Sequence, residues 1–359
     1  MPKYKQFPEY KNHEKIIALD DPPSGLKGFI AIHSTMRGPA LGGTRIFPYK
    51  NPNQALKDAL KLSSAMTNKC VMAKLRFGGG KGVIIADPKS KNLSSLLRAY
   101  AKKISELKGE FYTGEDVGLN ETDVQYMLKF SPYFIGKSGQ AGDPSPFAAQ
   151  SAFLCARTAW KSLRGSSNLS GLTVAIKGVG KTGSALAKLF AAAGSKVTVA
   201  DINPHAVRTL QKSHPAISAI SIKALPDLRA DIYAPCALGS DITLKNYKRI
   251  KARLVVGTAN NQLENPEVAR HLHNNHILHV PDYIANAGGL IDVADELLPG
   301  GYNEQRVLKS IAKLEAVLER ILALSKKAGI NPDQAAEQEA QRVLAPKQPR
   351  VKAAESVIA

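Results

Sequence analysis

Lys69 and Lys81, which stand twelve residues apart, are the residues of this sequence best suited to chemistry. Lys81 lies in the run Gly-Gly-Gly-Lys-Gly over residues 78–82, and glycine lets main chain approach a ligand closely because it has no Cβ. A lysine enclosed in this way loses hydration, which favours its neutral form and lets it accept a proton. Lys69 need only stay charged to hold an anionic group. The stretch could therefore bind a carboxylate and carry out acid–base chemistry beside it. The alternative is a solvated lysine at a helix end, followed by a glycine turn.

A carboxylate in a similar setting follows later in the chain. Asp116 lies between Gly114 and Gly118, directly after a strand predicted at 110–112. Glycine on both sides again indicates a side chain that close backbone places in a pocket. A turn-forming aspartate is the ordinary alternative.

A dinucleotide-binding pattern occupies the middle of the chain. A strand predicted at 172–177 leads into Gly-Val-Gly-Lys-Thr-Gly at 178–183, and a helix is predicted at 184–193. This is G-x-G-x-x-G between a strand and a helix, the context in which glycines let pyrophosphate approach a helix N-terminus. The next predicted strand, 196–200, ends in Asp201, whose carboxylate can accept hydrogen bonds from ribose hydroxyls and would repel a 2′-phosphate. The pattern therefore favours NAD over NADP.

The same segment also fits a relaxed P-loop over residues 175–182. A P-loop opens with glycine, however, and Ala175 stands in that position inside the apolar strand. No strand ending in a Walker-type aspartate is evident, and Asp201 is explained better by dinucleotide binding.

Composition narrows the class of protein. The chain has 359 residues, 44% of them hydrophobic, which predicts a globular protein of two domains. We find no secretory signal and no run long enough to span a membrane. The three cysteines lack the spacing of metal ligands, which indicates reduced thiols and no metal site. We therefore expect a cytoplasmic protein. The formal charge of +19 comes from scattered lysines rather than one dense block, which argues against nucleic acid as the main partner.

Hydrophobic periodicity predicts the elements that position these residues. In the first part we expect a strand at 28–33, a glycine-rich loop at 38–45, a helix at 53–66 that delivers Lys69 just past its end, a strand at 83–86 and a helix at 93–107. In the second part we expect a hinge at 142–146, a helix ending at Trp160, further strands at 231–234, 253–257 and 277–280, and a helix at 303–327 stopped by Gly329. Alternating strands and helices of this kind predict a parallel, doubly wound sheet, and the tail from Ala345 is expected to be loose.

The ordered motifs resemble the amino-acid dehydrogenases of the glutamate, leucine, phenylalanine and valine group over nearly the whole chain. The segments that carry the resemblance are residues 38–45, 66–69, 79–81, 115–118, 178–183, 234–237, 259–263 and 286–289. Each motif alone is weak, and their common order makes the resemblance specific.

The resemblance implies a role for each site residue. Lys81 would activate water and polarise the carbonyl, Asp116 would carry a proton to and from the amine, and Lys69 would hold the substrate carboxylate. The other implied substrate-binding residues are Leu41, Gly42, Gly43, Met66, Gly114, Asn261, Leu290 and Val293. The implied cofactor-binding residues are Gly178, Gly180, Lys181, Thr182, Gly183, Asp201, Ile202, Ala237, Ala259, Asn260 and Asn286.

The implied fold is α/β, with a substrate-binding and oligomerisation domain at 1–143 and a Rossmann-type NAD-binding domain at 144–329. The active site would lie in the cleft between them, and residues 330–359 would form a C-terminal helix and loose basic tail that packs back on the first domain. The implied activity is NAD-dependent, reversible oxidative deamination of an L-amino acid to a 2-oxo acid and ammonia, by a homo-oligomer. A catalytically idle nucleotide-binding relative is the alternative, which the intact catalytic residues oppose.

The apolar pocket residues argue against a second substrate carboxylate and therefore against glutamate. Gly114 and Leu290 match phenylalanine-type members, whereas branched-chain members have alanine and valine there, so L-phenylalanine is favoured, with leucine, tryptophan and tyrosine as alternatives. The sequence departs from the family at Asn68, where an aromatic residue is usual, and at Ala148 and Ser151. A threonine in place of Ala148 would bond the nicotinamide amide, so orientation of the cofactor is the property these departures affect.

Overall fold

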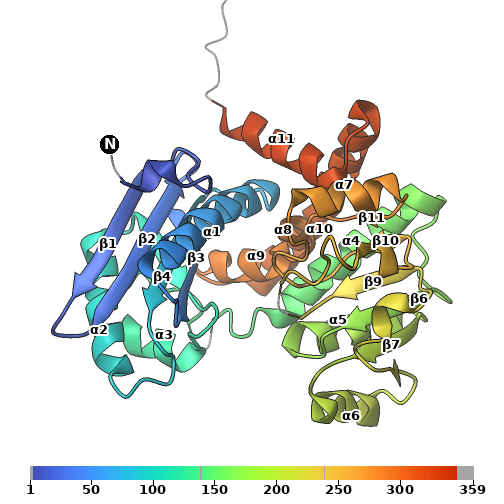
Figure 1. The fold of residues 1–359 in the computed structure, drawn as a ribbon, viewed down its shortest axis with the longest axis horizontal. Helices are drawn as coiled ribbons and strands as arrows, with labels where there is room; N and C mark the ends of the chain where they lie inside the picture. Colours follow the sequence, from blue (N-terminus) through green and yellow to red (C-terminus); the bar gives the residue numbers. More distant parts are fainter. Residues whose placement is uncertain (1–2, 138–139, 238, 346–359) are drawn as a thin grey trace, which may run out of the picture.

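The computed structural model describes residues 3–137, 140–237 and 239–345, which form two α/β halves side by side (Figure 1). Each half is built on its own sheet. Helix α9 (Ala287–Asp295) lies between the halves, and helix α11 (Pro332–Leu344) lies at the top of the view (Figure 1). This arrangement confirms the expected α/β class with two sheets. The predicted loose tail falls on residues 346–359, which lie outside the described residues.

The first half has a five-stranded mixed sheet in the order β1-β2-β4-β3-β5. Strand β2 pairs antiparallel with β1 and β4, whereas β3 pairs parallel with β4 and β5. Its strands are β1 Lys15–Asp21, β2 Leu26–Ser34, β3 Ala40–Phe47, β4 Gly78–Ile85 and β5 Phe111–Gly114. Its helical segments are η1 Lys3–Gln6, α1 Pro52–Met72, α2 Leu93–Glu106 and α3 Glu121–Leu128.

The two faces of this sheet pack against different helices because successive residues of a strand point to opposite faces. Ala31 and Val83 pack with small residues of α1, whereas Ile30 and Ile84 pack with the apolar stripes of α2 and α3. Lys81 is two residues from Val83 in β4 and therefore lies on the α1 face, the same side as Lys69.

Glycine in β3 and β4 lets neighbouring elements, among them helix α1, approach so closely that a Cβ would overlap their atoms. A Cβ at Gly82 would overlap the Tyr100 hydroxyl and lie 2.5 Å from Thr44 Oγ1, and one at Gly79 would overlap Thr67 in α1. The prediction of a loop at 38–45 is therefore wrong, because Ala40–Phe47 forms a fully paired strand.

Two further boundaries differ from the sequence-based expectation. Strand β4 begins at Gly78 instead of residue 83, so that Lys81 is inside a strand and pairs with Ala31 of β2. Helix α1 continues to Met72, which places Lys69 in its last turn rather than past its end. Both differences arise because glycine and short polar residues lack the apolar periodicity by which strands and helices are recognised.

The second half has a six-stranded sheet, all parallel, in the order β11-β10-β9-β6-β7-β8, which confirms the predicted doubly wound architecture. Its strands are β6 Thr173–Lys177, β7 Lys196–Ala200, β8 Ser218–Ala219, β9 Ile232–Pro235, β10 Leu254–Val255 and β11 Leu278–His279. Its helices are α4 Ser145–Arg164, α5 Lys181–Ala192, α6 Pro204–Ser213, α7 Pro266–Asn274, α8 Asp282–Ala285, α9 Ala287–Asp295, α10 Glu304–Ala328 and α11 Pro332–Leu344. The 3₁₀ segments are η2 Leu225–Asp227 and η3 Tyr247–Arg249.

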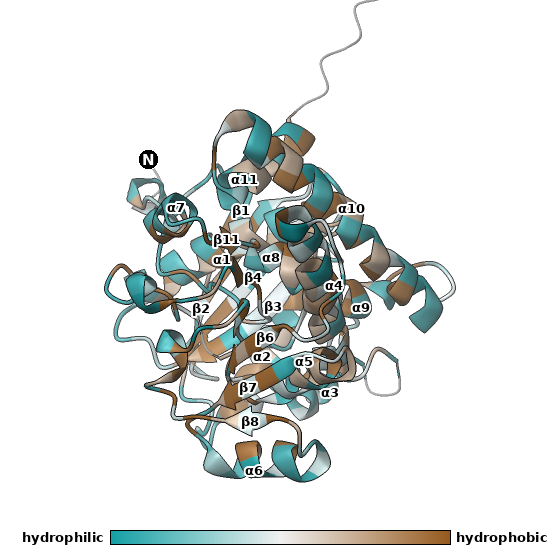
Figure 2. Cartoon of the chain, turned by 90° about the vertical axis from the view of Figure 1, so that its right-hand side faces the viewer, coloured by the Kyte–Doolittle hydropathy of each residue, from teal (hydrophilic) through white to brown (hydrophobic). Residues whose placement is uncertain are grey.

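Hydrophobic residues concentrate along β6 and β7 in the centre of this half, and hydrophilic residues colour much of the outer helices (Figure 2). Helices α4, α5 and α10 contribute to the main core on this sheet, and Gly329, with φ +64, ends α10 as predicted. Helix α4 runs to Arg164, past the expected end at Trp160, and α5 begins at Lys181 rather than residue 184.

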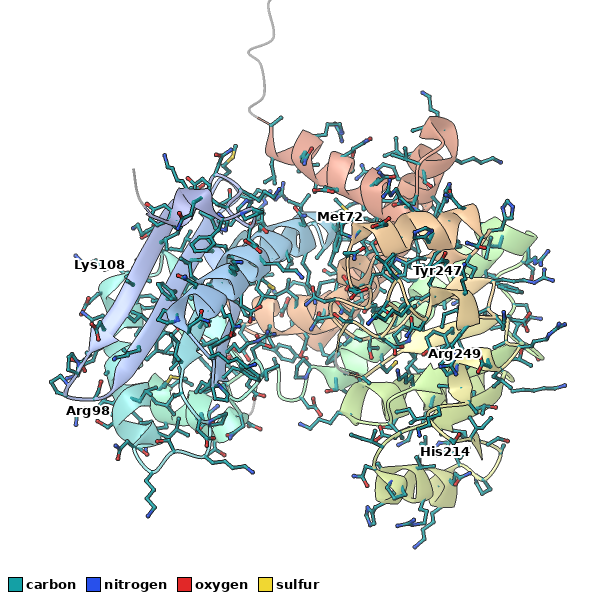
Figure 3. The ribbon with its side chains drawn as sticks, in the orientation of Figure 1. Met72, Arg98, Lys108, His214, Tyr247 and Arg249 are labelled. Atoms are coloured by element: carbon teal, nitrogen blue, oxygen red, sulfur yellow. The ribbon has the colours of Figure 1, made fainter. Side chains whose placement is uncertain are left out.

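Contacts of helices α9 and α11 are among those that join the halves. Leu290 and Ala294 of α9 share a buried cluster with Leu41, Cys70 and Phe77 of the first half. Helix α11 packs against α10 and also contacts α1. Side chains such as Arg98 and Lys108 lie on outer parts of the molecule, which agrees with scattered positive charge (Figure 3). Among the described helices, none combines the length and apolar character that crossing a membrane requires.

The close approach of other residues to Gly82 predicts that a side chain at this position changes the free energy of unfolding. Gly82→Ala should destabilise the chain by about 1–3 kcal/mol because the new methyl group overpacks a buried hydroxyl pair. A Cβ at Gly180, by contrast, meets nothing within 4 Å, so Gly180→Ala adds a methyl group without overpacking and should destabilise the chain less than Gly82→Ala. Urea titration followed by circular dichroism measures both, and an unchanged midpoint for Gly82→Ala would show that the strands can separate without cost.

Candidate active site

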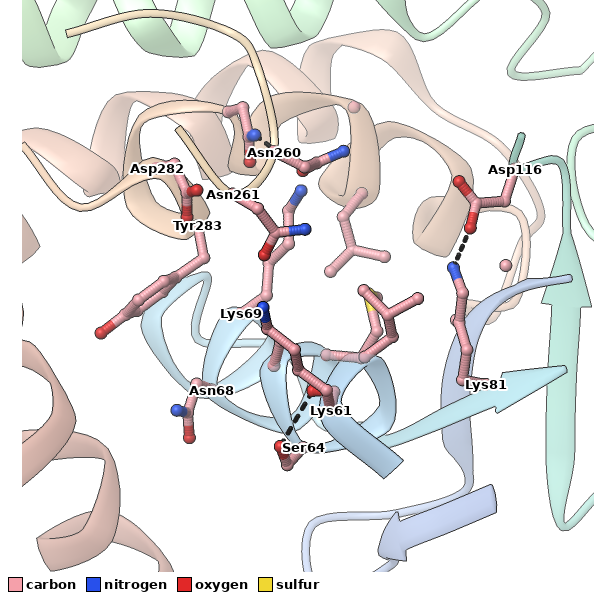
Figure 4. Close-up of a pocket in the computed structure, with 18 of the residues that line it drawn as sticks. Lys61, Ser64, Asn68, Lys69, Lys81, Asp116, Asn260, Asn261, Asp282 and Tyr283 are labelled. Atoms are coloured by element: carbon pink, nitrogen blue, oxygen red, sulfur yellow. Dashed lines mark hydrogen bonds and ion pairs between the residues drawn. The ribbon is translucent and has the colours of Figure 1, made fainter. Parts of the chain in front are cut away.

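A cavity of about 880 Å³ lies between the two halves, and residues of both halves line it (Figure 4). From the first half it receives Lys69 of α1, Lys81 of β4 and the segment that follows β5. From the second half it receives the ends of β10 and β11 and the helices α8 and α9. Carboxyl ends of parallel strands are where such sheets bind ligands.

Lys81 and Asp116 form an ion pair inside this cavity, although the two residues come from different segments of the first half (Figure 4). The Lys81 side chain is almost fully buried, at 6% exposed. Arg45 also reaches Asp116, with its Nε 3.3 Å from Oδ2, and its Nη1 is 2.8 Å from Asp58 Oδ2. Asp116 is therefore held between two cations, and Arg45 is itself held by a second carboxylate.

These cations decide the protonation of Asp116. Burial alone would raise the pKa of the carboxyl group, but Lys81 and Arg45 outweigh burial and hold the pKa well below its ordinary value. Asp116 is thus a carboxylate at neutral pH, able to accept a proton from an amine placed beside it.

Glycine brings this carboxylate into place. A Cβ at Gly43 would lie 2.6 Å from the Glu115 carbonyl oxygen and 3.0 Å from Asp116 Cβ, so a larger residue would push the Asp116 segment away. Gly42 approaches Gly80 and the Met66 side chain just as closely. Both glycines line the cavity, where they leave backbone accessible to a ligand.

Lys69 projects into the middle of the cavity (Figure 4). The pKa of its ammonium group is lowered to about 8, mainly by burial and also by nearby Lys81, while Asp282 and Asp116 act in the opposite direction. Lys69 is therefore cationic at neutral pH and loses its charge in mildly alkaline solution.

An apolar wall closes one end of the cavity. Met66, Gly114, Leu290 and Val293, four of the five residues expected in the side-chain pocket, line it. Leu41 is not among the lining residues but is fully buried in the cluster directly behind this wall.

Ile135 also lines this wall, and sequence analysis did not identify it. A Cβ at Gly114 would lie 2.8 Å from the Ile135 carbonyl oxygen and 3.0 Å from its Cγ1. Gly114 therefore sets the position of Ile135 in addition to providing space itself. The isolated bridge between Thr113 and Phe134 brings the two segments together, a contact without a signal in local sequence.

The glycine-rich loop after β6 has the geometry of a phosphate cradle. Gly178 has φ +101, and a Cβ there would lie 2.7 Å from the Ala237 nitrogen. A Cβ at Gly183 would overlap the Gly178 carbonyl. Gly180, at the N-terminus of α5, faces open space instead, so that pyrophosphate can approach the free N–H groups of the helix. The residues present therefore fit a dinucleotide.

The end of β7 completes the expected cofactor region. Asp201 accepts hydrogen bonds from the backbone N–H of Val179, at 2.6 Å, and of Asn203, at 2.7 Å, so its carboxylate also orders the glycine loop. Ile202 beside it is 86% exposed and offers an apolar surface at the sheet edge. Lys181 lies at the first turn of α5, with its Nζ 3.7 Å from Asp143 Oδ2, and lines a smaller adjacent cavity.

Three of the remaining expected cofactor residues meet at the edge of the main cavity. Asn286 Nδ2 donates to Asn260 Oδ1 at 2.8 Å and also contacts the Ala259 carbonyl at 3.2 Å. Asn286 Oδ1 is buried and has no partner among the described residues. Thr182 Oγ1 is bonded to Thr258 Oγ1 at 2.9 Å, and Asn261, with φ +51, turns its side chain towards Lys69 (Figure 4). An unpartnered amide oxygen at this edge suits a carboxamide N–H.

The structure shows what the serine at position 151 does. Its hydroxyl donates to the Ala285 carbonyl at 2.7 Å and accepts from Gly288 N–H at 3.0 Å, which ties α4 to the turn between α8 and α9. Ala148 lines the cavity and offers no hydrogen bond from its side chain.

Arg45, His279 and Asp282 are further charged or titratable residues at the cavity that sequence analysis did not assign. Arg45 follows the glycines of β3, and the alternation of that strand would have placed it on the Lys81 side had the segment been recognised as a strand. His279 and Asp282 stand at and just after β11, the edge of a parallel sheet where ligand-binding residues are expected. Among the described residues, no group of three or more His, Cys, Asp or Glu side chains is arranged to hold a metal ion.

Comparison with known proteins places nearly the whole chain in one family. A family model described as the Glu/Leu/Phe/Val dehydrogenase dimerisation domain matches residues 13–132, and one described as Glutamate/Leucine/Phenylalanine/Valine dehydrogenase matches residues 145–348. A phenylalanine dehydrogenase of Lysinibacillus sphaericus is 43% identical over 309 residues, covering 84% of this chain and 81% of that protein.

Two other relatives carry the names of other amino acids. A leucine dehydrogenase of Bacillus subtilis is 38% identical over 328 residues, covering 90% of this chain and 89% of that protein. The crystal structure of L-tryptophan dehydrogenase from Nostoc punctiforme superposes with a TM-score of 0.81 at 34% identity, covering 92% of this chain and 95% of that one. Similarity therefore assigns the family and leaves the amino acid open.

Proposed function

The chain belongs to the Glu/Leu/Phe/Val dehydrogenase family, a family of amino-acid dehydrogenases that use a nicotinamide cofactor, and on that premise we propose that it catalyses reversible, NAD-dependent oxidative deamination of an L-amino acid. The observation that carries the proposal is the Lys81–Asp116 pair, which shares one cavity with Lys69 and with the residues around the cofactor edge. We propose residues 1–143 as the substrate domain, 144–329 as the NAD domain and 330–359 as a C-terminal extension.

In the proposed reaction, Lys69 holds the substrate carboxylate through its ammonium group, and Gly42 and Gly43 leave room for backbone contacts. Bound NAD supplies the acceptor for hydride from Cα. Asp116 takes and returns protons at the amine, and Lys81 activates the water that adds to the resulting iminium carbon. Loss of ammonium then leaves the 2-oxo acid. The cations around Asp116 keep its carboxylate ionised before the substrate binds.

The family model for residues 13–132 is described as a dimerisation domain, which supports a homo-oligomer. Exposed positions of edge strand β1, which pairs only with β2 among the described strands, supply a surface for association. A mass equal to one chain in light scattering would contradict this proposal.

Lys81→Ala should abolish turnover, because Asp116 and Lys69 cannot replace the group that activates water. NADH binding, followed by nicotinamide fluorescence, should survive because Lys81 does not contribute to the glycine loop. Lys91→Ala, which removes an exposed lysine of the same half, is the control. If Lys81→Ala kept a tenth of wild-type activity towards amino acids, the base would have to be another residue.

The pKa of Lys69 predicts how carboxylate binding depends on pH. The folded-state pKa is lowered to about 8, so the cation is present below pH 8 and is lost as pH rises through that value. The inhibition constant of 3-phenylpropanoate, which has no amine to titrate, should therefore rise towards about tenfold per pH unit above pH 8. Lys69→Arg keeps its charge throughout and should give a flat profile, even if the absolute affinity is weaker. A flat profile for wild type would remove Lys69 as the carboxylate holder.

We propose NAD rather than NADP because the Asp201 carboxylate stands at the end of β7, where a 2′-phosphate would be repelled. The ratio of kcat/KM for NAD over NADP should be large in wild type and should fall in Asp201→Asn, which keeps one oxygen for the Val179 N–H. Asp20→Asn, an exposed change in β1, should leave the ratio as it was. Equal use of both cofactors by wild type would refute the assignment.

We propose an aromatic substrate, L-phenylalanine, with leucine-type and tryptophan-type activity as the alternatives. Support comes from the apolar wall of Met66, Ile135, Leu290 and Val293 and from the absence of a cation among the described residues of that wall. In Gly114→Ala/Leu290→Val the new methyl displaces Ile135, and the ratio of kcat/KM for phenylalanine over leucine should fall by about tenfold or more. The wild-type ratio decides the proposal, and a clear preference for leucine would reverse it.

A further inference from the structure

The main cavity continues past Lys69, on the side away from Lys81 and Asp116, into a space that the proposed catalytic roles do not use (Figure 4). Residues of the N-terminal segment, the outer face of α1, the start of α7, α8 and α11 line this space, which we name the upper chamber. Helices α7 and α11 lie in the upper part of Figure 1. In the same view α5, which begins at the glycine loop, lies below these helices, so a dinucleotide at the loop would leave the upper chamber open.

The charge of the upper chamber is opposite to that of the protein. Five carboxyl groups line it: Glu9, Glu264, Asp282, Asp333 and Glu337. Lys11 and Lys61 are its lysines, and Lys69 stands at its inner boundary. Since the whole chain carries +19, this acidic concentration is a local exception, and low-dielectric walls focus such a field onto small ions.

Two acceptors in the chamber lack partners. His279 is 3% exposed and is one of the residues that line the cavity. Its Nδ1 is bonded to Asp333 Oδ2 at 2.8 Å, and its Nε2 has no partner among the described residues. Burial lowers the pKa of His279, but Asp333 and Asp282 outweigh burial and raise it above its ordinary value. In the neutral ring, which forms above that pKa, the proton stays on Nδ1 and the Nε2 lone pair is a buried acceptor. Glu9 Oε2 is likewise buried and unpartnered. Unpartnered acceptors of this kind are costly unless a donor occupies the space beside them.

Asp282 connects the upper chamber with the catalytic side. Its Oδ2 accepts from Gln262 N–H at 3.1 Å, which fixes the turn carrying Asn261. Its charge also acts on Lys69. A cation that passes Asp282 therefore reaches the place where Lys69 and Asn261 face each other (Figure 4).

We propose that the upper chamber binds ammonium and is the route by which ammonium enters and leaves the catalytic pocket. This inference rests on the proposed function, because amination of a 2-oxo acid consumes ammonium. The two co-substrates have opposite charge, and the structure separates them: Lys69 serves the anionic 2-oxo acid, while the carboxylates and His279 Nε2 offer the acceptors that N–H donors require. A dinucleotide at the opposite end would not block this route.

Steady-state amination by the full-length protein, with NADH, phenylpyruvate and ammonium chloride, tests the route. Glu337 is exposed on α11 and takes no part in the proposed chemistry, so Glu337→Lys should fold. At an ionic strength near 0.01 M, where charges act over roughly 30 Å, Glu337→Lys should raise the KM for ammonium at least about twofold. The KM for phenylpyruvate should not rise, because a new cation does not repel an anion.

Glu9→Lys should repeat the effect from the opposite wall of the chamber. Glu106→Lys makes the same charge change at the end of α2, away from the chamber, and should alter neither KM. The increases should shrink at an ionic strength of about 1 M, where the screening length falls to about 3 Å. An unchanged KM for ammonium in both chamber variants, or equal increases for both co-substrates, would overturn the route. If wild type lacked amination activity with every 2-oxo acid, the proposed function itself would fail instead.

Discussion

Asp116 can serve the site only because backbone from three segments comes close enough to hold a lysine and a carboxylate in one enclosed place. Gly79 lies against Thr67 of α1, Gly43 lies against Glu115, and Gly82 makes room for Tyr100. A side chain at any of these positions would separate the strands or displace the segment that carries Asp116. The ion pair of Lys81 with Asp116, the support from Arg45 and the position of Lys69 all depend on this close approach.

The pKa values of Asp116 and Lys69 are set by different surroundings within the same cavity. Asp116 is buried but meets two cations, which keep it ionised. Lys69 is surrounded by less compensating charge, so burial dominates and lowers its pKa to about 8. Beyond Lys69 the lining becomes acidic, although the chain as a whole is strongly basic. A single cavity thus offers a cation for a carboxylate, a carboxylate for an amine and, further out, acceptors for a small cation.

The junction of the halves links specificity with architecture. Leu290 and Val293 reach the apolar wall from α9, while Met66 and Ile135 come from the first half. Ser151 ties the turn before α9 to α4, and Glu296, at the end of α9, accepts hydrogen bonds from the backbone of Gly136 and Ala141. The wall that would contact a substrate side chain is therefore assembled from both halves, and its shape depends on how α9 is held.

Local sequence by itself determined the parallel sheet, the glycine loop and the choice of Lys69, Lys81 and Asp116 as site residues. The order of strand, loop and helix, and the glycines on either side of a charged residue, can be recognised from consecutive residues. Only the tertiary structure decided that residues 40–47 and 78–82 are strands, because their glycines show no apolar alternation and are held by pairing with neighbours distant in sequence. It also decided that Ile135 controls the space beside Gly114, that Arg45 shares Asp116, and that His279 and five carboxyl groups surround one chamber. Those relations join residues from separate elements, and burial and charge at such places follow from packing across the chain rather than from any one segment.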